Sequence, residues 1–212
     1  ETFGFDTAVS YATDALDRLH STAASHGLTM VMEVMGRYAG WIALHAGVAG
    51  TADVILLPEI PYDIEKVLAK VRQRYENGRG FAIIAVAEGA KPIGGMHSII
   101  GKSVGQAERL GGAAQFLSDI IAERTGVETR CTVLGHLQRG GSPTPYDRLL
   151  SLRFGSAAVR TLAEGVFGVM VVLDPPEVRY VPLDQVVGHL KTVPLFCDTI
   201  ATARDLGVCL GD

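Results

Sequence analysis

Residues 54–89 read VILLPEIPYDIEKVLAKVRQRYENGRGFAIIAVAEG, and this stretch decides the fold class. An apolar run over 54–57 is followed by amphipathic helical spacing over 64–76, which Asn77-Gly78 closes, and then by a second apolar run over 82–87. Strand-length apolar runs that alternate with helices indicate βα units in a mainly parallel sheet. Their almost continuous apolar character is typical of strands covered on both faces. We therefore predict an α/β fold.

The same alternation continues on both sides of this stretch. Between residues 89 and 112 the chain is rich in glycine and has no steady period, so we expect a long loop with a short helix near 105–109. Further strands are predicted over 29–34, 128–134, 167–173 (a buried strand) and, as a short extended segment, 179–182. Further helices are predicted over 7–20 with Asp6 as N-cap, 40–49, 113–125, 145–162, 184–189 and 197–206.

Composition narrows the class of protein. The chain has 212 residues, of which 48% are hydrophobic and 20% charged, and this content of apolar residues excludes a disordered protein. No apolar run is long enough to span a membrane, and no basic region opens the chain as a secretory signal would. The net charge of −4 without a basic cluster argues against nucleic acid as a partner. Three cysteines without CxxC spacing indicate neither a metal site nor disulfides, so we expect a reducing, cytoplasmic setting.

Polar residues follow the predicted strands where ligands bind in open parallel sheets, beyond the carboxyl ends. Residue 34 is followed by Met35-Gly36-Arg37, residue 57 by Pro58-Glu59, residue 87 by Glu88-Gly89, and residue 134 by GHLQRGG over 135–141. Guanidinium, imidazole and glycine N–H donors suit a phosphate group, whereas carboxylates suit sugar hydroxyls. Together these residues point to a phosphorylated polyol.

Each element also has an ordinary structural interpretation. Arg37 can be a solvated arginine after a turn, Glu88 a surface acid, and the glycines of 135–141 a plain turn. His136 with Arg139 is the more specific signal, because the adjacent Gly140-Gly141 backbone can approach an anion closely. The phosphate loop G-x-x-x-x-G-K-[ST], the dinucleotide fingerprint G-x-G-x-x-G and the hydrolase motif G-x-S-x-G are all missing, so a dinucleotide-dependent oxidoreductase is excluded.

At this point the sequence resembles a known family. EVMGRYAGWIAL (33–44), AEGAKP (87–92) and above all VLGHLQRGGSPTPYDR (133–148) are similar to 6-phosphofructokinases of the bacterial type. TFGFDTAV (2–9) and DRLHSTAASH (17–26) extend the resemblance in order over nearly the whole chain, and 94–112 matches least well.

The resemblance implies a role for several residues. Arg37, within the strand-end segment that holds fructose 6-phosphate, would be the catalytic residue that stabilises the transferred phosphoryl group. Glu88 would bind sugar hydroxyls, His136 and Arg139 the 6-phosphate, and Arg130 would cross a subunit interface to a neighbour's sugar phosphate. The substrate-binding residues implied in this way are Met35, Gly36, Arg37, Glu88, Arg130, His136, Gln138 and Arg139.

The resemblance also implies an organisation and partners. Residues 1–138 would form the fructose 6-phosphate domain, 139–190 would return to a nucleotide domain missing from this chain, and 191–212 would be a tail helix. The intact enzyme would use Mg²⁺ with ATP or pyrophosphate as phosphoryl donor and would be a homo-oligomer, a dimer or tetramer. The catalytic aspartate and the donor site would precede Glu1, so we expect sugar-phosphate binding without turnover, and an isolated chain of marginal stability.

Two departures from the family pattern leave an alternative open. Leu28 stands where a second arginine would reach the neighbour's sugar phosphate, and His20 stands where effector-regulated members often carry an arginine. A non-catalytic sugar-phosphate sensor, or a degenerate partner subunit, is the competing hypothesis.

Overall fold

The computed structural model describes residues 2–95, 99–101 and 109–212, and it divides the chain into two compact units. The larger unit comprises Val9–Gly140 and Thr192–Asp212, and the smaller unit comprises Glu1–Ala8 and Gly141–Lys191. The elements of the larger unit are α1 (Phe5–His26, whose first turn belongs to the smaller unit), β1 (Thr29–Val34), α2 (Trp41–Ala49), β2 (Val54–Leu56), α3 (Ile64–Glu76), β3 (Ala82–Ala87), β4 (Ile99–Gly101), β5 (Arg109–Leu110), α4 (Ala113–Thr125), β6 (Thr129–Val133), the 3₁₀ turn η1 (Gly135–Arg139) and α6 (Asp198–Asp205).

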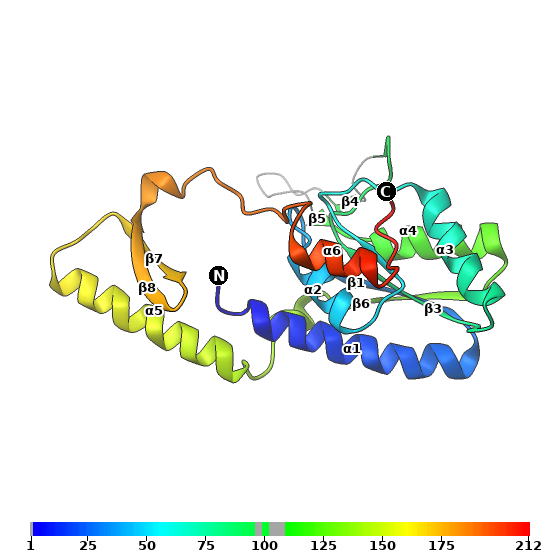
Figure 1. The fold of residues 1–212 in the computed structure, drawn as a ribbon, viewed down its shortest axis with the longest axis horizontal. Helices are drawn as coiled ribbons and strands as arrows, with labels where there is room; N and C mark the ends of the chain where they lie inside the picture. The colour runs from blue at the N-terminus through cyan, green and yellow to red at the C-terminus, as the bar shows by residue number, and fades with distance from the viewer. Residues whose placement is uncertain (1, 96–98, 102–108) are drawn as a thin grey trace. The chain divides into compact units, whose positions relative to one another are not determined.

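The larger unit is built on a four-stranded parallel sheet in the order β2-β3-β1-β6. β1 lies in the middle, with Thr29 in register with Ala82 of β3 on one side and with Thr129 of β6 on the other. Helices α1, α2 and α6 cover one face, where Leu16, Leu44 and Ile200 are buried, and helices α3 and α4 cover the other (Figure 1). The predicted α/β class with a parallel sheet is confirmed.

The C-terminal segment closes one edge of this sheet. Ile55 of β2 donates its N–H to the carbonyl of Cys209 at 2.9 Å, and Cys209 donates its own N–H to the carbonyl of Asp53 at 3.0 Å. The edge strand β2 therefore has backbone partners on both sides, and the tail predicted to be helical over 197–206 forms α6 and returns to the sheet.

The smaller unit differs from the sequence prediction in two places. Its elements are α5 (Pro145–Ala163), β7 (Val169–Asp174), β8 (Glu177–Pro182) and the 3₁₀ turn η2 (Leu183–Gln185). The predicted buried strand over 167–173 instead forms an antiparallel hairpin with β8 and is only partly buried. The predicted helix over 184–189 is wrong, since only the three-residue η2 forms and Gly188 takes a φ of +84° that a right-handed helix cannot hold.

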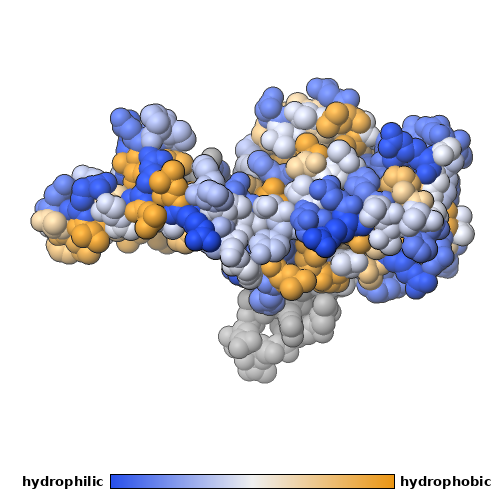
Figure 2. Space-filling view, turned by 90° about the horizontal axis from the view of Figure 1, so that it is seen from below, coloured by the Kyte–Doolittle hydropathy of each residue, from blue (hydrophilic) through white to orange (hydrophobic). Residues whose placement is uncertain are grey.

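Apolar side chains remain exposed on the smaller unit, and Figure 2 shows them as orange surface over this part of the chain. They include Leu149, Leu152, Val159 and Leu162 of α5, each at least 59% exposed. This helix buries its opposite side, at Leu150 and Ala157, against its own unit. An exposed apolar stripe of this kind is typical of a surface that packs against another protein surface.

The first turn of α1 is fixed to the start of α5 within the smaller unit. The predicted N-cap Asp6 lies one residue inside α1, and its carboxylate accepts the hydroxyl of Thr144 at 2.6 Å. The buried carboxylate of Asp147 accepts the N–H of Thr7 at 2.8 Å. Each helix start thus receives acceptors from the other, as helix N-termini require. The short helix predicted near 105–109 lies mostly outside the described residues, and Arg109 belongs to β5.

Candidate sugar-phosphate site

Three loops of the larger unit leave the same edge of the sheet. They follow β3, β1 and β6, which are neighbours in that order, and they begin with Glu88, Met35 and Leu134. Parallel strands lie about 4.8 Å apart, so these loops start within roughly 10 Å of one another. The sheet therefore gathers the predicted carboxylate, guanidinium and imidazole residues on one edge, as expected from the strand ends.

The loops after β1 and β3 are in direct contact through their backbones. Gly89 donates its N–H to the carbonyl of Gly36 at 3.1 Å, and Gly36 donates its N–H to the carboxylate of Glu88 at 3.4 Å. A Cβ placed on Gly89 would lie 1.9 Å from the carbonyl oxygen of Arg37, so only glycine permits this approach. The sequence analysis named Glu88 but assigned no role to Gly89, because the contact joins residues far apart in the chain.

The loop after β6 begins with η1, in which Gly135 has a φ of +48°. His136 and Arg139 are three residues apart and both are exposed. A 3₁₀ turn has three residues per turn, so these two side chains project from the same side. A guanidinium and an imidazole side by side at a glycine-rich loop supply the hydrogen-bond donors that a phosphate group needs.

Gln138 takes a different position from its neighbours. It is only 2% exposed; its Oε1 accepts the N–H of Met35 at 3.3 Å and its Nε2 donates to the carbonyl of Gly135 at 3.1 Å. The sequence interpretation placed Gln138 among the residues that touch the sugar phosphate. In the structure its side chain faces backbone atoms inside the protein.

Arg37 lies at the mouth of the site, half-buried, with its guanidinium carbon 5.8 Å from the ring centroid of Tyr38. This is within the range of a cation–π contact, which orients a guanidinium without neutralising it. The charge of Arg37 thus stays available to an anionic ligand.

Arg130 lies away from this edge. It is in β6 in register with Met30, is 67% exposed, and forms an ion pair with Glu128 at 2.7 Å. At about 3.3 Å per residue it lies roughly 13 Å along the strand from Leu134. Arg130 is therefore not brought to the site of its own chain.

Glu59, which also follows a strand, has a structural role. Its two carboxylate oxygens accept the N–H of Gly40 at 3.1 Å each, and one of them accepts the N–H of Val193 at 2.8 Å. Glu59 caps the start of α2 and holds the returning C-terminal segment. Its oxygens are therefore engaged inside the protein.

Glu33 is a buried acid that sequence reasoning did not single out. It is 3% exposed, faces α4 from β1, and its Oε2 accepts the N–H of Ala114 at 3.0 Å. Burial raises the pKa of Glu33 above its ordinary range, the N–H groups at the start of α4 oppose this, and the nearby charge of Glu88 raises the pKa further. The signal in the sequence was a single charge within an otherwise apolar strand, TMVMEV.

The two departures from the family pattern have ordinary surroundings. Leu28 is 7% exposed and packs in the apolar core. The Nε2 of His20 lies 2.8 Å from the carbonyl oxygen of Gly50, and its ring packs edge-on against Phe81. Leu28 directly precedes β1, and the two residues that His20 contacts precede β2 and β3. Both positions therefore lie at the amino ends of the strands, at the opposite end of the sheet from the candidate site.

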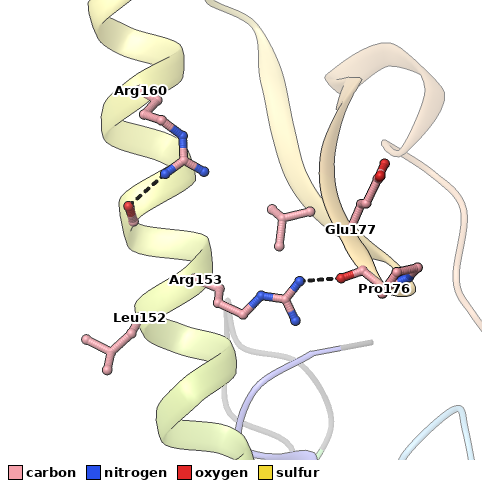
Figure 3. A pocket seen from close by; sticks show the side chains of 7 residues that line it. Leu152, Arg153, Arg160, Pro176 and Glu177 are labelled. Carbon is pink, nitrogen blue, oxygen red and sulfur yellow. Dashed lines mark hydrogen bonds between the residues drawn. The ribbon is translucent and has the colours of Figure 1, made fainter.

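A hollow of about 570 Å³ in the smaller unit contains none of the candidate residues. It lies between α5 and the β7–β8 hairpin, where Arg153 donates to the carbonyl of Pro176 and Arg160 to the hydroxyl of Ser156 (Figure 3). Glu177 lines the same hollow, and its carboxylate would repel an anion. We assign no site to it.

Among the described residues, no three His, Cys, Asp or Glu side chains are grouped so as to hold a metal ion. Within the same part of the chain, no helix has the length and apolar character needed to cross a bilayer.

The fold and the candidate site together define an α/β protein with a parallel sheet whose carboxyl edge presents arginine, histidine and glutamate on glycine-rich loops. The family comparison is specific: the model described as "Phosphofructokinase" matches residues 1–162. The chain belongs to the phosphofructokinase family.

Relatives agree with this assignment. The chain is 54% identical over 211 residues to an ATP-dependent 6-phosphofructokinase of Chloroflexus aurantiacus, covering 100% of this chain and 58% of the relative. It is 54% identical over 197 residues to a pyrophosphate–fructose 6-phosphate 1-phosphotransferase of Amycolatopsis mediterranei, covering 92% of this chain and 57% of the relative. The chain thus spans little more than half the length of these relatives.

A solved structure supports the fold. Phosphofructokinase from Saccharomyces cerevisiae matches with a TM-score of 0.73 at 27% identity, over 96% of this chain and 25% of that chain. The fold predicted from sequence, a phosphofructokinase-like α/β protein that is part of a longer family architecture, is confirmed.

Proposed function

We propose that this chain is the sugar-phosphate-binding portion of a 6-phosphofructokinase, which transfers a phosphoryl group to the 1-hydroxyl of fructose 6-phosphate. The observation that carries the proposal is the set of hydrogen bonds between the loops after β3, β1 and β6, which hold Glu88, Arg37 and the pair His136 and Arg139 at one edge. The names of the relatives support the same reaction.

Each side chain then has a physical task. His136 and Arg139 bind the 6-phosphate through charge-assisted hydrogen bonds, and Glu88 accepts sugar hydroxyls. The Met35-Gly36 backbone supports the sugar, and Arg37 stabilises the charge on the transferred phosphoryl group. Because phosphoryl transfer depends on positioning and electrostatics, cations at the remote phosphate and at the reacting phosphate are the expected parts.

Arg130 acts on a second copy in this proposal. Its distance from its own site and its exposure on β6 support a role in which it reaches the 6-phosphate bound by a neighbouring subunit. The protein would then be a homo-oligomer, a dimer or a tetramer, acting in the cytoplasm.

The phosphoryl donor binds outside the residues described above. Since the phosphate-loop motif is missing from this sequence, we propose that the donor, ATP or pyrophosphate with Mg²⁺, binds to the remainder of the enzyme. The smaller unit, with its exposed α5 stripe, would belong to that nucleotide domain. The chain alone would then bind fructose 6-phosphate without turnover.

Isothermal titration with fructose 6-phosphate tests the proposal. Wild-type chain should bind, and Arg139→Ala should weaken binding about 10- to 100-fold, since a hydrogen bond to a charged group contributes about 1.5–3 kcal/mol. Arg18→Ala removes another exposed arginine, which pairs with Asp14 on α1, and it should leave the affinity unchanged. A wild-type chain that releases or absorbs no heat would refute sugar-phosphate binding.

A further inference from the structure

The geometry of η1 separates two kinds of side chain. His136 and Arg139 lie on one exposed side of the 3₁₀ turn, whereas Gln138 lies a third of a turn away and is buried. With 2% of its surface exposed, Gln138 cannot reach a ligand at the mouth of the site.

The amide of Gln138 can take only one orientation in this position. Its oxygen faces the N–H of Met35, and its nitrogen faces the carbonyl of Gly135. Rotating the amide by half a turn would place its NH₂ group against the N–H of Met35, where two donors would face each other. It would also place the amide oxygen against the carbonyl of Gly135, where two acceptors would face each other. A glutamine fits here because the position needs one acceptor and one donor.

The contact between Gln138 and Met35 lies just beyond the last backbone hydrogen bond between β1 and β6. Leu134 donates its N–H to the carbonyl of Glu33, and after it the chain leaves the sheet. Four residues later, Gln138 ties η1 to the turn after β1, while Glu88 accepts the next N–H, that of Gly36. The Met35-Gly36 backbone is thus held by side chains from both flanking loops.

We propose that Gln138 is a positioning residue: without touching the sugar, it sets the spacing between the phosphate clamp of His136 and Arg139 and the turn that carries Arg37. The inference rests on the proposed function, because the clamp and the turn are assigned there. It replaces a direct contact between Gln138 and the substrate.

A glutamate at this position gives a pH-dependent test. In Gln138→Glu, the ionised carboxylate accepts from Met35 but opposes the Gly135 carbonyl, so fructose 6-phosphate should bind about 10- to 100-fold more weakly than to wild type near pH 7.5. Protonation restores a donor toward Gly135, and burial raises the pKa of such an acid. The ratio of the two dissociation constants should therefore shrink toward one near pH 5.5.

Three comparisons make this test specific. Gln138→Ala should lose affinity at both pH values without recovery, and Gln73→Glu, the same change at an exposed position of α3, should bind as wild type at both. Taking ratios to wild type removes the pH effects that the variants and the wild type share. Since the recovery is measured within one variant, it does not depend on Gln138→Ala folding.

Amide hydrogen exchange provides a readout without sugar. The Met35 N–H should exchange at least about 10-fold faster in Gln138→Ala than in wild type, whereas a residue that only touched substrate would leave it unchanged. A ratio for Gln138→Glu that stays constant with pH, or an unchanged Met35 exchange rate, would overturn the positioning role while wild-type binding stands. Absence of wild-type binding would instead overturn the proposed function.

Discussion

Replacing Gly89 with alanine perturbs the contact between the β1 and β3 loops. The new Cβ would lie 1.9 Å from the carbonyl oxygen of Arg37, 2.6 Å from its carbonyl carbon and 2.9 Å from the carbonyl oxygen of Gly36. All three are backbone atoms, so no side chain can rotate away. To reach an ordinary contact of 3.4 Å from 1.9 Å, the Arg37 turn must retreat by about 1.5 Å.

The displacement sets the expected magnitude. Overpacking of this kind costs about 1–3 kcal/mol of stability. A misplacement of about 1 Å at a site can cost up to roughly 100-fold, so Gly89→Ala should weaken fructose 6-phosphate binding about 10- to 100-fold. Isothermal titration measures the affinity, and thermal unfolding by circular dichroism measures the loss of stability.

Gly47→Ala is the matched control for this substitution. Its Cβ would lie 2.6 Å from Cγ1 of Ile55, a smaller overlap that also needs relief, and it would meet a side chain in the core rather than the backbone of the site. This variant should lose stability while the folded protein keeps its affinity for fructose 6-phosphate. If Gly89→Ala binds as tightly as wild type at a temperature where both are folded, then Gly89 does not set the geometry of the site.

The remaining predictions concern stability. Because burial raises the pKa of Glu33, the folded state binds a proton more tightly than the unfolded state. Wild type should therefore gain stability relative to Glu33→Gln as pH falls through the raised pKa toward the ordinary pKa of an unfolded glutamate; thermal unfolding across pH checks this, and a constant difference would contradict it. Arg74→Met should lower the free energy of unfolding by about 3 kcal/mol, because it leaves the mostly buried carboxylate of Asp53 without its ion-pair partner at 2.8 Å. Urea unfolding measures this loss, and a loss near zero would mean that water already compensates the charge of Asp53. The chain alone should be marginally stable or aggregate through the exposed apolar stripe of α5. The double variant Leu149→Lys, Leu152→Lys should therefore aggregate less, as measured by light scattering. A sharp, reversible unfolding transition of a monomeric wild-type chain would refute this.

The elements that the sequence predicted best are those with local signals. The strands over 29–34 and 82–87 and the helices over 64–76 and 113–125 agree with the structure to the residue. Their ends are set by residues in or next to the segment, such as the N-cap Asp63, whose carboxylate accepts the N–H of Glu65 at the start of α3. By contrast, the apolar run over 167–173 has the same composition in a parallel sheet and in a hairpin, so periodicity could not distinguish them.

The sequence indicated which loops form the candidate site, but it did not indicate the contacts between those loops. Strand ends indicated which loops converge, because carboxyl ends of parallel strands meet at one edge. The role of Gly89 depends on an approach to Arg37, which follows β1 rather than β3, and no local pattern contains it. The burial of Gln138 follows from η1 being a 3₁₀ turn, which the glycine-rich loop did not indicate.

The arrangement of η1 has an energetic reason. Burying a neutral amide costs little when both of its polar groups are bonded, whereas burying an unpaired guanidinium or imidazolium is far more costly. The turn therefore places its neutral residue, Gln138, inside, where it bonds to backbone groups, and leaves His136 and Arg139 exposed to water. A phosphate that binds there can replace this water and form charge-assisted hydrogen bonds with the two side chains. Before the phosphate binds, the folded protein does not have to bury an uncompensated charge. In the proposed site, the rigidity and the charge are thus supplied by different side chains of one five-residue turn.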